Sequence, residues 1–347
     1  MTARAGAARA AAADAAPRRA ADSIRAAGPV AELANAILNG DARAVARAMT
    51  LVENGAPEAE ALLDAIFGKK PESPRVGVTG PPGAGKSTLV AEYARLLRAE
   101  GVRVGVVAVD PTSPFTGGAI LGDRVRMGEH ATDPAVFIRS MATRGSLGGL
   151  AARTGELCEV LDAWGAGTTL IETVGVGQSE LDVAETADTV AVVLTPESGD
   201  AIQALKAGLM EIADVLVLNK ADHPGADAME AALRSSLAFR PQGGWKPPIV
   251  RTVGIERKGI EAMHAAILQH REHVSRPEVR GDVRRAKTRL RLRNAVREGL
   301  MGRWFSGGRF ETELDREADR VLEGKISPHR AARDLMERIT RDAEHAS

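Results

Sequence analysis

Residues 80–87, which read GPPGAGKS, constrain the fold of this chain more than any other stretch. They satisfy the pattern G-x-x-x-x-G-K-[ST], in which a glycine-rich turn points backbone N–H groups at a phosphate. An apolar run at 75–79 precedes the pattern, and apolar residues at helical spacing follow it. The segment therefore predicts a buried strand, a phosphate-binding loop, and a helix whose positive end faces the bound phosphate.

Two side chains of this loop have predicted roles in phosphoryl transfer. Lys86 is expected to reach the β- and γ-phosphates and to offset their charge, and the Ser87 hydroxyl is expected to bind Mg²⁺. A glycine-rich turn without a ligand is the alternative, and the flanking strand and helix disfavour it. The predicted phosphate-binding residues are Gly80, Gly83, Ala84, Gly85, Lys86, Ser87 and Thr88.

Composition bounds the class of protein. The 347 residues are 44% hydrophobic and carry 46 basic and 46 acidic side chains, so no overall field attracts nucleic acid or a membrane surface. A single cysteine, Cys158, excludes an internal disulfide and a cysteine-rich metal site. No apolar run approaches the roughly 18 residues of a membrane span. We expect a cytoplasmic protein with neither nucleic acid nor membrane as partner.

Four regions follow along the chain. Residues 1–28, rich in Ala and Arg, predict a loose tail, with an organellar transit peptide as the alternative. Residues 29–68 predict three short amphipathic helices separated at 39–41 and 55–57. Residues 69–275 predict the nucleotide domain, and 276–347 a helical arm.

Within 69–275, short apolar runs alternate with helical ones, which predicts an α/β fold: a mostly parallel sheet with helices on both faces and helical extensions at each end. Ligands of such sheets bind beyond the carboxyl ends of the strands. The expected strands lie at 75–79, 103–109, 135–139, 168–171, 189–194, 214–218 and 248–253.

Polar motifs follow two of these strands. Asp110 ends one strand and opens a loop rich in Gly, Pro, Ser and Thr that runs to Asp123, a composition suited to reorganising around a phosphate and a metal. Glu172 ends another strand, three residues before Gly175. In P-loop proteins this spacing places a carboxylate near Mg²⁺ and a backbone N–H near the γ-phosphate.

A third motif predicts the base. Asn219, Lys220 and Asp222 form the pattern N-K-x-D after a strand. The Asp222 carboxylate can accept the ring N–H and the exocyclic amine of guanine, whereas adenine would leave a buried acceptor unpaired. The predicted nucleotides are GTP and GDP. A closing base contact is expected from the loop after the next strand, where Val253 lacks a hydroxyl and the Gly254 N–H is the candidate donor.

These motifs together resemble the MeaB/ArgK-type G proteins, which act as chaperones of adenosylcobalamin-dependent acyl-CoA mutases such as methylmalonyl-CoA mutase. The resemblance covers about 30–275 and rests on Glu172 and on the runs at 109–127, 137–151, 172–180 and 196–208. It implies that Lys86 is the phosphate lysine, and that Mg²⁺ is surrounded by Ser87, Asp110, Asp123 and Glu172.

The resemblance also implies partners and moving parts. It suggests an adenosylcobalamin-dependent mutase as partner (methylmalonyl-CoA mutase or a relative such as 2-hydroxyisobutyryl-CoA mutase), an adenosyltransferase, and a homodimer formed through the C-terminal helices. Three segments are expected to respond to the nucleotide: 110–123, 172–180 and 196–208, the last including Asp200, Gln203 and Lys206.

Hydrolysis is expected to be slow in the isolated protein. Many GTPases place a water-orienting Gln directly after the D-x-x-G glycine, but Val176 stands there and Gln178 follows two residues later. Because a supplied arginine increases such rates by about 10³–10⁵, docking of the mutase is expected to stimulate turnover. Arg144 is an internal candidate for that charge, with a solvated loop arginine as the alternative.

The C-terminal arm is basic and then acidic. Residues 276–303 carry ten Lys or Arg against three acids, and Leu292, Val296, Leu300 and Trp304 form an apolar stripe on this helix. Because the following helix is acidic, complementary packing explains the charge better than RNA binding. The arm is expected to break at 307–308 and 327–328.

Two rival functions stay open. A nickel- or zinc-insertion GTPase would need grouped soft or imidazole ligands. Here Cys158 is expected in the core, and His270 and His273 are expected to be surface residues. The other rival is a non-catalytic, GTP-dependent scaffold, in which binding alone matters.

Overall fold

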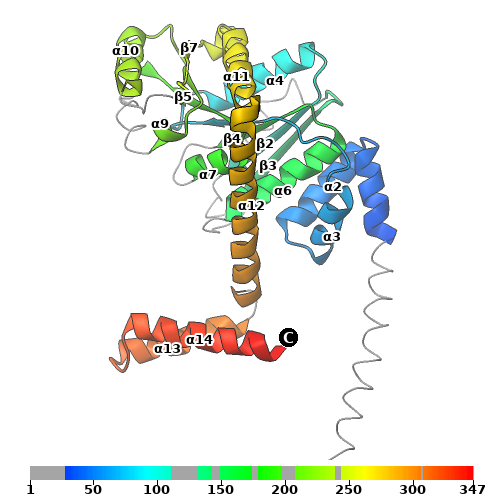
Figure 1. Ribbon diagram of the computed structural model, residues 1–347, viewed down its shortest axis with the longest axis vertical. Helices are drawn as coiled ribbons and strands as arrows, with labels where there is room; N and C mark the ends of the chain where they lie inside the picture. The colour runs from blue at the N-terminus through cyan, green and yellow to red at the C-terminus, as the bar shows by residue number, and fades with distance from the viewer. Residues whose placement is uncertain are drawn as a thin grey trace, which may run out of the picture. The chain divides into compact units, whose positions relative to one another are not determined.

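The computed structural model describes residues 28–110, 132–142, 149–173, 179–196, 208–238, 244–305 and 308–346. Seven parallel strands form one sheet in the order β3-β2-β4-β1-β5-β6-β7 (Figure 1). Their bounds are β1 (Arg75–Thr79), β2 (Val104–Asp110), β3 (Val136–Ala142), β4 (Thr168–Thr173), β5 (Thr189–Leu194), β6 (Val215–Leu218) and β7 (Ile249–Arg251). All seven expected strands are confirmed.

Two strands run further than the apolar pattern predicts. β3 continues to Ala142 and β4 to Thr173, because β2 pairs with them as far as Asp110 and Val109. Glu172 therefore lies inside a strand rather than after it.

β1 lies at the centre of the sheet, between β4 and β5. β4, β2 and β3 lie on one side of it and β5, β6 and β7 on the other, so the strand order changes direction at β1. Open α/β sheets bind their ligands beyond the carboxyl ends of the strands at such a change of direction. The loop that follows β1 is the predicted phosphate-binding loop.

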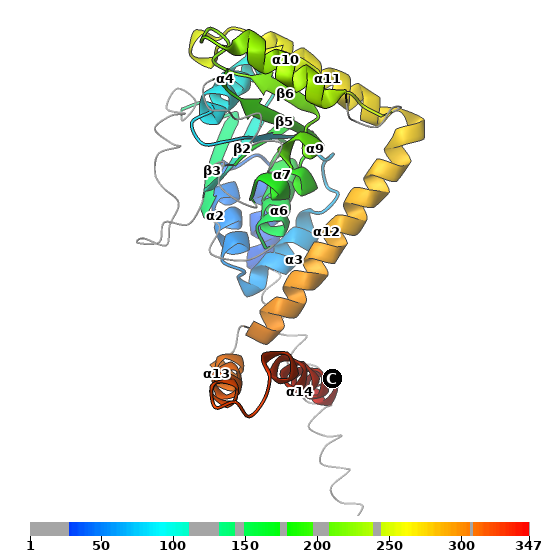
Figure 2. The ribbon, with the colours of Figure 1, turned by 90° about the vertical axis from the view of Figure 1, so that its left-hand side faces the viewer.

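Helices cover both faces of the sheet, as predicted. Figure 1 shows α4 (Lys86–Ala99) and α11 (Ile260–Ser275) above the sheet, with α6 (Gly149–Trp164) and α7 (Ser179–Thr186) below it. α9 (Leu209–Ile212) and α10 (Ala226–Leu237), seen again in Figure 2, contribute to the same core as α6 and α7. A second core lies between the sheet and the pair α4 and α11.

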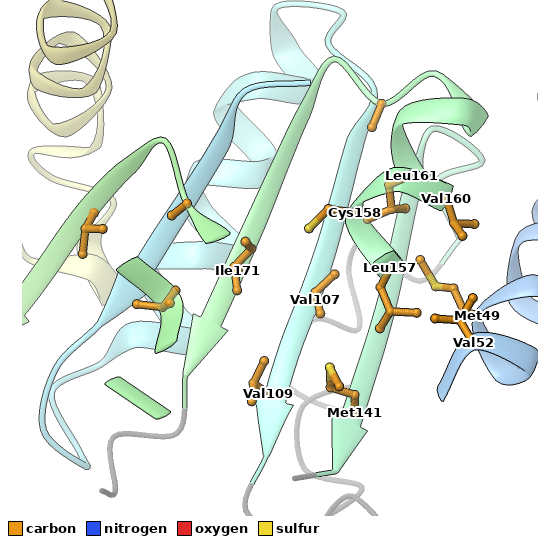
Figure 3. Close-up of a cluster of buried hydrophobic side chains, with 14 of the residues drawn as sticks. Met49, Val52, Val107, Val109, Met141, Leu157, Cys158, Val160, Leu161 and Ile171 are labelled. Atoms are coloured by element: carbon orange, nitrogen blue, oxygen red, sulfur yellow. The ribbon is translucent and has the colours of Figure 1, made fainter. Parts of the chain in front are cut away.

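The three predicted N-terminal helices are present at residues 28–38, α2 (Ala42–Glu53) and α3 (Pro57–Ile66). Asp41 caps α2, accepting from the backbone N–H groups of residues 43 and 44 at 2.7 and 3.3 Å. Met49 and Val52 of α2 lie beside Leu157 and Val160 of α6 (Figure 3). These helices thus add a layer outside α6. Cys158 is fully buried in α6, which confirms its expected place in the core.

Charged side chains hold the amino end of β1. Arg75 is 1% exposed and donates from its guanidinium to Asp162 at 2.9 Å, while its backbone N–H donates to Asp188 at 3.0 Å. Asp162 also accepts from the backbone and hydroxyl of Ser73, at 2.8 and 2.6 Å. Lys287, in the helix α12 (Pro277–Phe305), donates to Asp188 at 2.9 Å and so links this helix to the same strand end.

The remaining helices are α12 (Pro277–Phe305), α13 (Gly308–Leu322) and α14 (Pro328–Ala346). The chain divides into two compact units, 1–288 and 289–347. α13 and α14 begin at the expected breaks. Glu317 of the acidic helix α13 accepts from Arg320 of the same helix at 2.8 Å and from Arg338 of α14 at 2.5 Å. α13 packs along α14, and Arg338 supplies the complementary charge to Glu317.

Leu292 and Val296 of the predicted apolar stripe are 62% and 61% exposed, while the side chains of Leu300 and Trp304 lie outside the described residues. None of the described helices combines the length and apolar composition needed to cross a membrane.

The expectation that His270 is a surface residue is wrong. Its ring is buried, 2.9 Å from the Thr189 hydroxyl and 3.2 Å from the Asp214 carboxylate, and it contacts Trp245. Position 270 continues the inward stripe of α11 formed by Ile260, Met263, Ala266 and Ile267. His273, one turn further, is half-buried against the same Trp.

Burial, together with the nearby charges of Lys287 and His273, lowers the pKa of His270 from 6.5 to about 4, and Asp188 opposes this only partly. The unfolded chain therefore takes up this proton first as the pH falls. We expect His270 to contribute stability above pH 6.5 that is lost between pH 6.5 and about 4, with a slope of up to about 1.4 kcal/mol per pH unit. Urea unfolding of wild type and His270→Gln across this range measures the effect, and His329→Gln, at an exposed site, is the control. Parallel profiles for wild type and His270→Gln would contradict it.

Candidate functional site

The phosphate-binding loop lies at the carboxyl end of β1, between the ends of β4 and β5. Gly80 has φ +139°, and a side chain there would place its Cβ 2.1 Å from the carbonyl oxygen of Val193 in β5. Gly85 has φ +89°, and a Cβ there would lie 2.4 Å from Asn219 Nδ2. Neighbouring backbone and side chains thus require glycine at both positions.

Lys86 begins α4 and is 5% exposed. Its ammonium donates to the carbonyl oxygens of Gly80 and Pro81, both at 2.8 Å. The cation is therefore held inside the loop that is predicted to surround the phosphates. Binding of a polyphosphate would offer the ammonium charged oxygens in exchange for these neutral ones.

Two of the four predicted metal residues meet. Ser87 Oγ donates to Glu172 Oε1 at 2.5 Å, and Glu172 is 5% exposed. A hydroxyl and a carboxylate are oxygen donors of the kind Mg²⁺ prefers, so this pair fits the ion. Asp110 is the last residue of β2, next to β4 at the same edge of the sheet. Asp123 lies outside the described residues.

Several other predicted residues also lie outside the described part of the chain. They are Gly175, Val176 and Gln178, Arg144, and Asp200, Gln203 and Lys206.

Asn219 joins three loops. It is 3% exposed, and its Nδ2 donates to the carbonyl oxygen of Ala84 at 2.8 Å. Its Oδ1 accepts from the Thr252 hydroxyl at 3.0 Å and from the Gly254 backbone N–H at 3.1 Å. One amide side chain thus links the phosphate-binding loop, the loop after β6 and the loop after β7.

The rest of the guanine motif is also held in place. Lys220 has φ +54°, a left-handed conformation, and the N–H of Ala221 donates to the carbonyl oxygen of Thr252 at 3.0 Å. The Asp222 carboxylate is 42% exposed and lies 3.8 Å from His223 Nε2. Its acceptor oxygens are therefore accessible to a base.

The loop after β7 differs in detail from the expectation. Val253 is 9% exposed, and η3 (Gly254–Glu256) follows it. The Gly254 N–H, which was expected to donate a hydrogen bond to the base, donates to Asn219 Oδ1 in the structure. A Cβ at Gly254 would lie 3.2 Å from Leu89 of α4, so this loop packs closely on the helix of the phosphate-binding loop.

A family model for the methylmalonyl-CoA mutase-associated GTPase MeaB matches residues 45–308. The Escherichia coli GTPase ArgK is 36% identical over 319 residues, covering 89% of this chain and 96% of that protein. Mouse methylmalonic aciduria type A homolog, a mitochondrial protein, is 32% identical over 326 residues, covering 88% of this chain and 78% of that protein.

The crystal structure of a LAO/AO transport system kinase superposes with a TM-score of 0.66 and 30% identity, covering 90% of this chain and 97% of that one. This chain belongs to the MeaB family of GTPases. The resemblance expected from the motifs is thereby confirmed, and so are the P-loop GTPase fold and GTP hydrolysis as the activity.

The sequence does not indicate the contacts of three residues of this MeaB-family site. Thr252 bonds Asn219, as described above, and Thr173 Oγ1 donates to Thr79 Oγ1 at 2.9 Å. Thr79 and Thr173 are buried, and each lies directly beside a motif residue, Gly80 or Glu172. That adjacency is the only signal in the sequence, because the partner of each hydroxyl is more than 30 residues away along the chain.

We expect Asn219→Ala to destabilise the nucleotide-free protein by about 2–4 kcal/mol, because it leaves the Thr252 hydroxyl, the Gly254 N–H and the Ala84 carbonyl buried without their partner. Thr252→Val removes one of the three bonds and should cost about 1 kcal/mol. Urea unfolding without nucleotide measures both. An Asn219→Ala protein as stable as wild type would show that the amide does not hold the loops together.

Proposed function

We propose that this GTPase couples its nucleotide state to cofactor loading, or cofactor protection, of an adenosylcobalamin-dependent acyl-CoA mutase. The supporting observation is the family match, whose description names methylmalonyl-CoA mutase and whose 264 matched residues (45–308) contain every described motif of the site. The mouse relative, named for methylmalonic aciduria, agrees with this assignment. The partner is methylmalonyl-CoA mutase or a close relative such as 2-hydroxyisobutyryl-CoA mutase.

Guanine is the proposed base. The Asp222 carboxylate is accessible, and the buried amide of Asn219 fixes the loops on both sides of the base position. The Gly254 N–H would approach the base only by sharing or leaving its bond to Asn219. Val253 supplies packing rather than a side-chain hydrogen bond.

Mg²⁺ would be held by Ser87 and Glu172, with Asp110 and Asp123 around them, and it would neutralise charge on the β- and γ-phosphate oxygens. Lys86 would exchange the carbonyl oxygens of Gly80 and Pro81 for phosphate oxygens. The backbone N–H groups of the loop and the amino end of α4 would orient the phosphates for in-line attack by water.

Docking of the mutase is proposed to increase hydrolysis, since Val176 replaces the usual water-orienting glutamine. The added charge would come from Arg144 or from the mutase. A homodimer through the C-terminal helices, contact with an adenosyltransferase and a cytoplasmic location complete the proposal.

Asp222→Asn is expected to weaken GDP binding by at least about 10²-fold and to favour xanthosine diphosphate, because the amide N–H can donate to the 2-oxo group of xanthine. Calorimetry with GDP, XDP and ADP measures the change. Asp64→Asn, an exposed site on α3, should bind GDP as wild type does. Wild-type protein that binds ADP as tightly as GDP would refute the base assignment.

Single-turnover GTP hydrolysis with and without each candidate mutase tests the partner. We expect the correct mutase to increase the rate at least tenfold, a modest part of the roughly 10³–10⁵ that a supplied arginine can contribute. Arg144→Ala should abolish the stimulation if this residue supplies the charge, and should leave it intact if the mutase does. Unchanged hydrolysis, together with unchanged cofactor loading in every nucleotide state, would exclude the coupling.

A further inference from the structure

The ends of β1 and β4 are joined by a pair of side-chain hydroxyls. The last backbone partners of the two strands are Val78 and Glu172. The next residue on each strand is a threonine, and Thr173 Oγ1 donates to Thr79 Oγ1 at 2.9 Å. Thr79 is 0% and Thr173 1% exposed, so this bond is shielded from water. We call the two residues the threonine pair.

The threonine pair adjoins both parts of the proposed metal site along the chain. Thr79 directly precedes Gly80, the first residue of the phosphate-binding loop, and Thr173 directly follows Glu172. On its other side, Gly80 is packed so closely on β5 that no Cβ fits there. The start of the loop is therefore held from both neighbouring strands, and on the β4 side the threonine pair provides a side-chain bond.

Alternation along the strands separates the threonine pair from the metal residues. Val78 and Leu170 face the core beneath α4, whereas Ile171 faces the core beneath α6 and α7. Because successive side chains of a strand point to opposite faces, Glu172 shares the α4 face with Ser87, and Thr173 points to the other face. The pair can thus act on Glu172 only through the backbone of β4.

We propose that Thr79 and Thr173 are positioning residues for Mg²⁺: their buried hydroxyl bond holds the end of β4 against the phosphate-binding loop and thereby sets the separation of Ser87 from Glu172. This inference rests on the proposed Mg²⁺ site. Removing the bond leaves the contacts to base and phosphates intact but loosens the carboxylate relative to the hydroxyl. Without this bond, the affinity for nucleotide in the absence of Mg²⁺ is unchanged, while the additional affinity that Mg²⁺ provides is reduced.

The test is the dissociation rate of a fluorescent GDP analogue from the full chain, measured in EDTA and over a Mg²⁺ titration. Thr173→Val should raise the Mg²⁺ concentration needed for half-maximal slowing of release by roughly five- to tenfold, the range expected for one buried hydrogen bond. Its rate in EDTA should stay within about twofold of wild type, because the contacts to base and phosphates do not include this bond. Thr173→Ser, which keeps the donor, should titrate as wild type does.

Two further variants separate positioning from folding. The double variant Thr79→Val/Thr173→Val removes both partners, so it should regain most of any stability lost in Thr173→Val while keeping the Mg²⁺ defect. Thr168→Val removes another buried hydroxyl, at the opposite end of β4, and should leave the Mg²⁺ titration unchanged.

The possible outcomes distinguish a failure of the proposed metal site from a failure of the inference about the threonine pair. If Mg²⁺ does not change the rate at which the wild type releases the GDP analogue, both the proposed metal site and the inference are refuted. A wild-type Mg²⁺ effect that both Thr173→Val and the double variant reproduce would leave the metal site standing and overturn the inference alone. An equal change in EDTA and in Mg²⁺ would also overturn it, since the hydroxyls would then support the fold and not the carboxylate.

Discussion

The buried amide of Asn219 is the interaction on which the site most depends. Its three hydrogen bonds reach the phosphate-binding loop at Ala84, the hydroxyl of Thr252 and the backbone of Gly254. Without it, three loops from different parts of the chain would meet with unsatisfied polar groups in a buried place. With it, the phosphate-binding loop and the loops after β6 and β7 are joined into one arrangement.

The sheet provides the support for this arrangement. β1 is central, and charged side chains hold its amino end through Arg75, Asp162 and Asp188. At its carboxyl end, close packing against β5 and the threonine pair toward β4 fix the start of the loop. Both ends of the strand that carries the P-loop are thus restrained, which suits a site whose catalysis is mostly positioning and electrostatics.

In the structure the charged side chains of the site are hydrogen-bonded to other groups of the protein. Lys86 binds two carbonyl oxygens of its own loop, and Ser87 donates to Glu172. Each of these groups has a protein partner that a nucleotide and its metal would replace. An incoming nucleotide would exchange these hydrogen bonds for its own. Until then, the protein partners lower the free-energy cost of burying the lysine and the glutamate.

The sequence by itself determined the class of fold, the order of the strands along the chain and the family, and it predicted which residues would contact the nucleotide. Apolar runs, glycine spacing and the motifs at Lys86, Glu172 and Asn219 are local signals, because each predicts a structure or a role from neighbouring residues alone. Only the tertiary structure decided which protein groups these and other polar residues contact. Asn219 bonds across three loops, Thr79 and Thr173 bond across two strands, and His270 is buried against Trp245. It also decided that α13 packs along α14. Such pairings join residues far apart in the chain, and a buried polar group selects its partner by proximity in the fold, which no local pattern records.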